Sequence, residues 1–321
     1  MSVGALSPRQ GEEVRHQRAV ANCYGFFGRV FPDCGFIDYT DGLYHGDPAV
    51  PFDEAQHNQV CYVLDEVRCS AGTRVLDVGC GNGRLLEEAR RRGAVGVGIT
   101  ISPDQLEFCR RRGLDVRLLD YKKMGDDWSG QFDAVVANGP IEHFVHPREA
   151  AQGRTDEIYR EMFRIFHRAI DPASPVRKFI NTTIHFVRPP RPEALLASPW
   201  SHKRGSDNWH WAWLQRGFGG FYPTFGQFER CAAGCFDLVK CVDGTQDYHF
   251  TSEEWLRRIR HGTSPRLRLR LFLNSLAFAL RHPRQTFNML YCMLGSESWN
   301  WQFRGADPPT RLLRQTWDYR P

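Results

Sequence analysis

The stretch VLDVGCGNGR, residues 75–84, contains an acid, Asp77, and then glycines at positions 79, 81 and 83. Glycines let a backbone turn tightly and approach a ligand closely, and a helix that begins behind them offers free N–H groups. A dinucleotide-binding loop needs its third glycine at position 84, where this chain has Arg84. The stretch therefore predicts a strand–turn–helix unit whose G-x-G-x-G spacing differs from the dinucleotide pattern. A tight turn without a ligand is the alternative.

Short apolar segments alternate with helical segments on both sides of this turn. Such a rhythm predicts an α/β fold with a parallel, doubly wound sheet and right-handed crossovers. Ser102 and Pro103 are expected to begin one of the helices, as cap and first residue. The expected strands cover residues 73–79, 94–100, 114–120, 132–138, 176–186, 236–244 and 247–251, and the expected helices cover 51–67, 84–93, 102–113, 155–170 and 225–234.

Charge and cysteine content restrict the class of protein. Residues 251–284 hold eight arginines and two glutamates, a local charge of +6, so the rest of the +5 chain is close to neutral at −1. A basic patch is predicted, but not the overall charge of a nucleic-acid-binding protein. Ten scattered cysteines without CxxC pairs predict reduced thiols in a cytoplasmic protein and no metal site. The N-terminus has no apolar core of signal-peptide length, so secretion is not expected.

The segment 75–84 resembles motif I of class I S-adenosylmethionine-dependent methyltransferases. Further segments resemble the cyclopropane fatty acid synthase family, which includes the mycolic acid cyclopropane synthases. The resemblance implies a Rossmann-like class I methyltransferase sheet, S-adenosylmethionine as cofactor, and a small-molecule or lipid substrate. The segments are DGLYHGDPAVPFDEAQ (41–56), GITISPDQ (98–105), LLDYKKM (118–124), ANGPIEHF (137–144), FYPTFGQF (221–228), DYHFTSEEWLRRI (247–259) and residues 286–315.

The resemblance also implies an order of regions along the chain. The expected regions are an N-terminal helical lid (1–70), an S-adenosylmethionine-binding α/β core (71–186), an aromatic-rich substrate insertion (187–235), the last core strands (236–251) and a helical C-terminal region (252–321).

Most residues of the expected site are carried over from the family's motifs, whereas Trp211, Phe221 and Tyr222 come from the aromatic-rich stretch 208–225. Glu142 and Tyr248 are the expected catalytic residues. The expected cofactor-binding residues are Asp77, Gly79, Gly81, Gly83, Thr100, Gln105, Asp120, Tyr121, Ala137 and Gly139, and the expected substrate pocket contains Tyr44, Trp211, Phe221 and Tyr222.

Two positions depart from the pattern of the cyclopropanating members, which hold a bicarbonate ion with a cysteine, a glutamate, a histidine and a tyrosine. The cysteine position maps to about Gly42 and the histidine position to Thr182. Half of that base site is missing, which argues against ring closure. We therefore expect C-methylation of an alkene in a lipophilic acceptor such as an unsaturated fatty acyl or isoprenoid chain, with Glu142 stabilising a cation or acting as base. N- or O-methylation of a small natural-product scaffold is the alternative, and the role of His143 is open.

The basic segment 264–284 places arginines at both ends of a 14-residue stretch, Leu267 to Leu280. A helix that spans a bilayer needs roughly 20 apolar residues, so a spanning helix is not expected. Two interpretations remain: an interfacial helix attracted to anionic lipids, which would make the protein peripherally membrane-associated, and an amphipathic helix that packs on the sheet with its arginines in water. The second is preferred.

Overall fold

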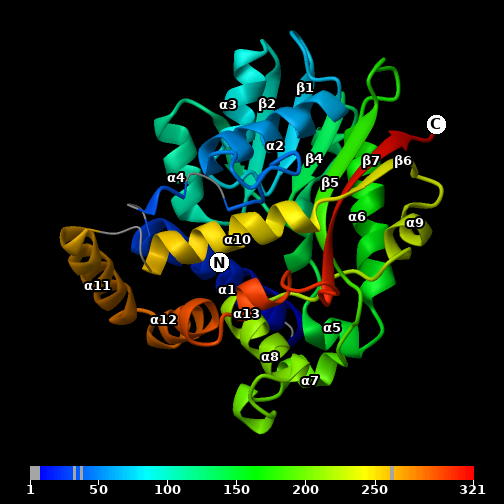
Figure 1. The fold of residues 1–321 in the computed structure, drawn as a ribbon. Helices are drawn as coiled ribbons and strands as arrows, with labels where there is room; N and C mark the ends of the chain where they lie inside the picture. Colours follow the sequence, from blue (N-terminus) through cyan, green and yellow to red (C-terminus); the bar gives the residue numbers. More distant parts are fainter. Residues whose placement is uncertain (1–7, 32–33, 37–38, 261–263) are drawn as a thin grey trace, which may run out of the picture.

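The computed structural model describes residues 8–31, 34–36, 39–260 and 264–321. One sheet of seven strands in the order β3-β2-β1-β4-β5-β7-β6 runs through the molecule (Figure 1). Strands β1 to β5 pair in parallel, and β7 pairs antiparallel with both β5 and β6. The strands are β1 (Arg74–Val78), β2 (Val95–Thr100), β3 (Asp115–Leu118), β4 (Ala134–Asn138), β5 (Lys178–Phe186), β6 (Phe236–Asp243) and β7 (Thr310–Tyr319).

Helices cover both faces of the sheet, because residues of β1 and β4 alternate between two apolar clusters. The side chains of Val75 and Val136 pack with α2 and α3 on one face, whereas Leu76 and Val135 pack with α1 and α6 on the other. The helices of this first part of the chain are α1 (Pro8–Val30), α2 (Phe52–Glu66), α3 (Arg84–Arg91), α4 (Pro103–Arg111), α5 (Pro147–Ala151) and α6 (Thr155–Ala169).

The strand order predicts a crevice between β1 and β4, at their carboxyl ends. After β1 the chain adds β2 and β3 on one side and then returns to β4 on the other, so the carboxyl ends of β1 and β4 form a topological switch point. Open α/β sheets bind their ligands at such a point. The expected parallel core and the Ser102 cap of α4 are confirmed.

Two predictions for the second half of the chain were wrong. Residues 247–251 lie in helix α10 instead of a strand, because Tyr248, Thr251, Trp255 and Ile259 share one buried face at helical spacing. The end of the expected helical tail is strand β7, which contains strand-favouring Thr, Trp and Tyr residues and pairs with strands on both sides. The remaining helices are α7 (Pro192–Leu196), α8 (Asp207–Gly217), α9 (Gln227–Ala232), α10 (Thr245–Arg260), α11 (Pro265–Ala279), α12 (Pro283–Leu290) and α13 (Ser298–Trp301).

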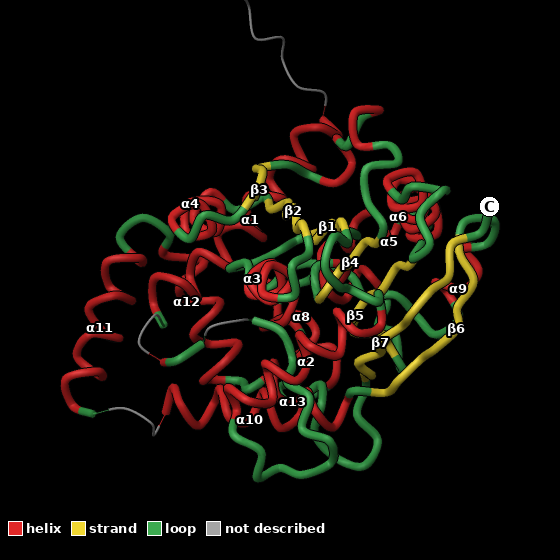
Figure 2. The backbone as a smooth tube through the Cα atoms, turned by 90° about the horizontal axis from the view of Figure 1, so that it is seen from above, coloured by secondary structure: helices red, strands yellow, loops and turns green. Residues whose placement is uncertain are grey.

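The basic segment forms α11 and the start of α12, and it does not pack on the sheet, which corrects the preferred interpretation. The ring of Phe278 packs on that of Phe26 in α1, with ring centres 5.5 Å apart. Figures 1 and 2 both place α11 at the opposite end of the molecule from β6 and α9. None of the helices in the described part of the chain is long and apolar enough to cross a membrane.

Candidate active site

A cavity of about 960 Å³ lies at the carboxyl ends of β1, β2 and β4. The loop after β1 forms part of its wall with Gly79 and Gly81 at φ +72° and +53°. A Cβ atom at position 79 would lie 2.5 Å from the Cβ of Pro140, so a side chain there would collide with the loop after β4. Eight of the ten residues expected to bind the cofactor line this cavity, namely Asp77, Gly79, Gly81, Thr100, Gln105, Asp120, Tyr121 and Gly139.

The other two expected residues lie behind the wall. Gly83 has φ +78°, and a Cβ atom there would lie 2.4 Å from Cδ1 of Leu114, so this glycine permits close packing of α3 against the chain that leads into β3. Ala137 is fully buried within β4. The structure therefore places both residues in support of the cavity and does not bring them to its surface.

Side-chain hydrogen bonds hold the β2 and β3 ends of the wall in place. Thr100 Oγ1 donates to Oε1 of Gln105 at 2.8 Å, which orients the amide of the glutamine beside the cavity. Asp120 accepts hydrogen bonds from the backbone N–H of Lys122 at 3.0 Å and from Nε2 of Gln17 at 2.5 Å. Burial raises the pKa of the Asp120 carboxyl. Gln17 belongs to α1, so the N-terminal helix closes over this side of the cavity.

Helix α1 contributes wall residues that no sequence motif identified. His16, Gln17 and Tyr24 line the cavity. Tyr24 Oη lies 2.7 Å from Nε2 of His143, and His16 Nε2 lies 2.7 Å from the backbone oxygen of His143. Burial lowers the pKa of His143 to about 3, so its imidazole is neutral. His143 therefore links the lid to the loop after β4.

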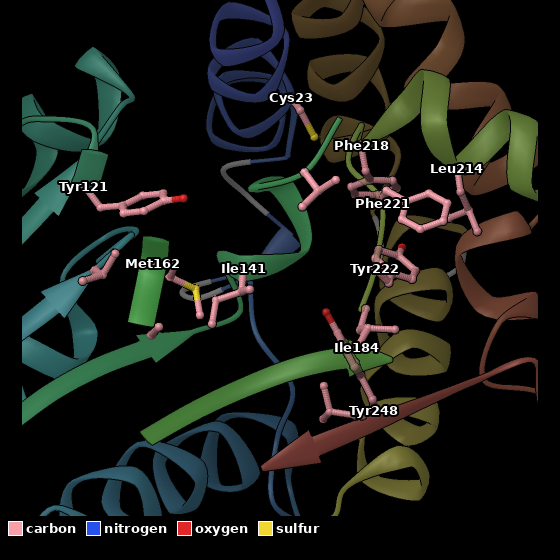
Figure 3. Packing of buried hydrophobic residues seen from close by; sticks show 14 of the residues in the cluster. Cys23, Tyr121, Ile141, Met162, Ile184, Leu214, Phe218, Phe221, Tyr222 and Tyr248 are labelled. Atoms are coloured by element: carbon pink, nitrogen blue, oxygen red, sulfur yellow. The ribbon is translucent and has the colours of Figure 1, made fainter. Parts of the chain in front are cut away.

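A second, smaller cavity of about 40 Å³ shares part of its wall with the first, including Gly139 and His143. Both expected catalytic residues, Glu142 and Tyr248, line it together with Thr182, Tyr222, Trp255 and Trp299. Figure 3 shows Tyr222 and Tyr248 gathered beside Ile184 near the end of β5. The two cavities thus meet at the loop that carries Gly139 and Glu142.

Glu142 is the centre of the small cavity. Its side chain is buried, Oε1 accepts a hydrogen bond from the backbone N–H of Ile184 at 2.9 Å, and Oε2 has no partner among the described residues. Burial raises its pKa to about 8, and the nearby Asp41 charge acts in the same direction, whereas the Ile184 N–H opposes them. The buried Oγ1 of Thr182 likewise has no partner in the described structure. Two polar atoms at this cavity are therefore available to a ligand.

The position of Glu142 depends on a glycine that sequence reasoning missed. Gly220 has φ +87°, and a Cβ atom at this position would lie 2.0 Å from the backbone oxygen of Glu142. Only glycine allows the loop after α8 to pack directly on the loop that carries Glu142. The only sequence signal is the Gly219-Gly220 pair, which marks a turn without indicating what the turn touches.

The loop at Gly42, to which the family's cysteine position is expected to map, lies beside the small cavity. Asp41 lines the small cavity, whereas the backbone N–H of Gly42 points to Thr251, with its nitrogen 2.8 Å from Oγ1. Asp41 is fully buried and pairs with Arg314 of β7, whose guanidinium also donates to Asp247 at 2.9 Å. A carboxylate held by a buried arginine therefore occupies the lid side of the cavity.

The expected substrate-pocket residues are divided between the cavity and its support. Tyr222 lines the small cavity. Trp211 and Phe221 do not line either cavity and instead pack their rings on Phe186, at 5.1 and 4.9 Å between ring centres. Tyr44 packs on Phe250, with ring centres 5.4 Å apart, and is also absent from both walls. The structure thus brings one of these four residues to Glu142.

The walls of the large cavity fit S-adenosylmethionine. Its volume suits a ligand of that size. Asp77, Gln105 and Asp120 line the cavity; a carboxylate at Asp77 would suit the ligand's ammonium group, and the other two side chains would suit its ribose and purine. The ring of Tyr121, stacked on Phe144 at 4.2 Å, offers an aromatic edge, and its buried Oη has no partner among the described residues. No three His, Cys, Asp or Glu residues of the described chain form a group that could hold a metal ion.

Comparison with known families agrees with this geometry. Residues 26–262 match the model of the family described as mycolic acid cyclopropane synthetase. The chain belongs to this family. Its members use S-adenosylmethionine, so this is the cofactor of the protein.

The curated relatives of this protein include enzymes whose names refer to lipids. A probable fatty acid methyltransferase of Pseudomonas putida is 38% identical over 112 residues, which cover 32% of this chain and 28% of the relative. The cyclopropane-fatty-acyl-phospholipid synthase of Escherichia coli K12 is 26% identical over 208 residues, which cover 63% of this chain and 42% of the relative. The chain therefore spans less than half the length of these relatives.

Solved structures confirm the fold of this family member as that of class I methyltransferases. Mycolic acid cyclopropane synthase CmaA1, solved with SAH and CTAB, has a TM-score of 0.68 at 20% identity, over 95% of this chain and 98% of that one. Coclaurine N-methyltransferase has a TM-score of 0.65 at 14% identity, over 98% of this chain and 90% of that one. At these identities the likeness concerns the fold alone.

Proposed function

We propose that the protein is an S-adenosylmethionine-dependent C-methyltransferase that acts on an alkene of a lipophilic acceptor, such as an unsaturated fatty acyl or isoprenoid chain. The observation that carries the proposal is Glu142, a buried carboxyl with one free oxygen in a small aromatic cavity directly beyond the cofactor cavity. An alkene that accepts a methyl group becomes a carbocation, which needs nearby negative charge or aromatic faces in a site that excludes water.

The residues around Glu142 have distinct tasks in this reaction. S-adenosylmethionine supplies an electrophilic methyl group on a sulfonium. The π electrons of the acceptor form the new C–C bond as the S–C bond breaks, and the faces of Tyr222 and Tyr248 stabilise the positive charge on the neighbouring carbon. Oε2 of ionised Glu142 then takes a proton from an adjacent carbon, and the C–H electron pair becomes a new double bond. The Ile184 N–H holds the other oxygen, which fixes the direction of Oε2.

The composition of the small cavity supports a methyl product over a cyclopropane ring. Asp41 stands at the lid side of the cavity, and Thr182 stands at the expected histidine position. Neither reproduces the cysteine and histidine of the bicarbonate site that the resemblance implied. Of the two carboxyl groups on this cavity, Glu142 is the one with an oxygen that has no partner in the described structure, which suits the loss of one proton to form an alkene.

The relatives support a lipid-like acceptor. The two curated relatives carry names of enzymes that act on fatty acids or fatty-acyl phospholipids. A geranyl diphosphate C-methyltransferase of Streptomyces coelicolor A3(2) shares the fold, with a TM-score of 0.56 at 15% identity over 94% of this chain and 97% of that one. The Streptomyces enzyme is an example of this fold in an enzyme named for methylation of an isoprenoid carbon.

A second candidate function is N- or O-methylation of a small natural-product scaffold. The observation that favours it is the size of the cavity beside Glu142, about 40 Å³, which suits a compact acceptor better than a chain. With a pKa of about 8, Glu142 could also take the proton of an amine or a hydroxyl. Coclaurine N-methyltransferase shares the fold.

The two functions are separated by product analysis. The protein is incubated with methyl-labelled S-adenosylmethionine and three acceptor pools: unsaturated phospholipids, isoprenyl diphosphates, and small amines and phenols. The proposal predicts mass-spectrometric gain of one methyl group on a chain carbon in one of the first two pools. Label only on nitrogen or oxygen would reject C-methylation in favour of the second function.

A further inference from the structure

Helix α11 has two apolar faces, and only one of them is covered. The covered face includes Leu271 and Phe278, which pack against the core at α1. The uncovered face holds Leu269, Phe272, Leu273, Leu276 and Leu280, whose exposed fractions are 58%, 63%, 51%, 49% and 80%.

The uncovered residues form a continuous stripe. They recur at i, i+3, i+4, i+7 and i+11, so at 3.6 residues per turn they fall within an arc of about 100° on the side opposite Phe278. A contiguous apolar stripe of this kind on a surface marks an interaction site. Most other exposed large apolar side chains in the described part of the chain are single residues on other elements.

Arginines border the stripe on both sides. On the helical wheel Arg268 lies on one edge and Arg266 and Arg270 lie on the other, while Arg281 and Arg284 follow at the turn into α12. The whole segment 264–296 contains these five arginines and no aspartate or glutamate. The surface is therefore both apolar and strongly cationic.

The combination of apolar and cationic side chains favours an anionic bilayer over a second copy of the chain as the partner of this surface. A second copy of the chain that docked through the same face would bring two sets of five arginines together, and like charges in contact destabilise an interface. An anionic bilayer accepts both features: apolar side chains enter the boundary between headgroups and acyl chains, while arginine side chains extend to the phosphates. Each basic residue near such a surface strengthens binding.

We propose that α11 is an interfacial helix that docks the protein on an anionic phospholipid surface. Lipid binding through α11 requires neither the cofactor nor methyl transfer, so the proposal goes beyond the proposed function. Its place in the fold connects it to the site, because α12 follows α11 directly and Gln285 of α12 lines the cofactor cavity. Docking through α11 therefore holds one wall of the active site close to the lipid surface.

Vesicle binding by the full-length protein, without cofactor or acceptor, tests this proposal. We expect co-sedimentation with phosphatidylglycerol vesicles, weaker binding at high salt, and little binding to phosphatidylcholine vesicles. The double variant Phe272→Asp/Leu276→Asp should bind at least 100-fold more weakly. The matched control Phe225→Asp/Val239→Asp changes side chains of similar exposure just before α9 and in β6, elements at the other end of the molecule from α11, and should bind like the wild type.

A second pair of variants separates charge from apolar contact. Arg266→Gln/Arg284→Gln should lower the affinity roughly 30-fold, about 5-fold for each arginine. The control Arg110→Gln/Arg191→Gln removes the same charge elsewhere and should have little effect.

Three results would overturn the proposal: equal binding to both kinds of vesicle, unchanged binding of both α11 variants, or a vesicle-free dimer that Phe272→Asp/Leu276→Asp dissociates in sedimentation equilibrium. None of these results bears on methyl transfer, which product analysis measures separately.

Discussion

The two cavities that meet at the loop after β4 are built in opposite ways. The large one is about 960 Å³, and the residues predicted to bind its cofactor come from the ends of parallel strands between residues 77 and 139. The small one is about 40 Å³ and rich in aromatic side chains, and much of its wall comes from the lid, the insertion, α10 and α13. Under the proposed function, the large cavity binds the cofactor that the family shares, whereas the small cavity selects the acceptor.

Replacing Glu142 should have the largest effect, because it should lower turnover, which depends on the small cavity, without changing cofactor binding in the large one. Glu142→Gln keeps the shape and the Ile184 hydrogen bond but removes the base, so turnover should fall about 10²- to 10⁴-fold while the cofactor Kd stays nearly unchanged. Because the pKa of Glu142 is about 8, wild-type kcat/KM should rise as the pH passes through about 8, and the variant should lack this rise. Steady-state kinetics across pH and calorimetric titration of the cofactor measure both quantities.

The same variant has a stability signature. Between pH 4.5 and about 8 the folded wild type keeps a proton on Glu142 that the unfolded chain has lost, so stability falls as the pH rises through this window, by up to about 5 kcal/mol. Glu142→Gln should lose that dependence, whereas Glu193→Gln, an exposed control on α7, should keep it. Parallel loss of turnover and cofactor affinity in Glu142→Gln would show that the carboxyl belongs to the cofactor side.

Removing Arg314 should have the next largest effect, because it supports the acceptor side only. Arg314→Leu leaves Asp41 buried without its partner, and the free energy of unfolding should fall by about 3–5 kcal/mol. Arg320→Leu removes an exposed ion pair with Asp237 just beyond the same strand and should cost less than about 1 kcal/mol. Urea denaturation measures both, and similar losses in the two variants would contradict a special role for the buried pair.

The sequence predicted most of the residues that line the large cavity, because they belong to short motifs that can be recognised locally. The loop around Asp77 to Gly83 and the cap at Ser102 are contiguous motifs, and parallel strands bring their carboxyl ends to one edge. Gln17 and Tyr24 were missed because a polar helix shows no signal for the cavity that it will cover.

The acceptor side was predicted less well because it depends on long-range pairing. Strand β7 mixes helix-favouring Leu and Arg with strand-favouring Thr, Trp and Tyr, so its own sequence does not decide the structure, and pairing with β5 and β6 makes it a strand. Its Arg314 pairs with Asp41 of the lid, and the two residues are 273 positions apart, so no local motif predicts this contact. Trp211 and Phe221 looked like pocket residues from composition, whereas packing on Phe186 places them behind Tyr222.

Calorimetric titration of clean, ligand-free protein tests the central claim that the large cavity binds S-adenosylmethionine through Asp77 and Gln105, next to Glu142. The account predicts binding heat with S-adenosylmethionine, weaker binding in Asp77→Asn, and no binding of a nicotinamide dinucleotide. Absence of heat with S-adenosylmethionine, together with binding of the dinucleotide, would contradict it.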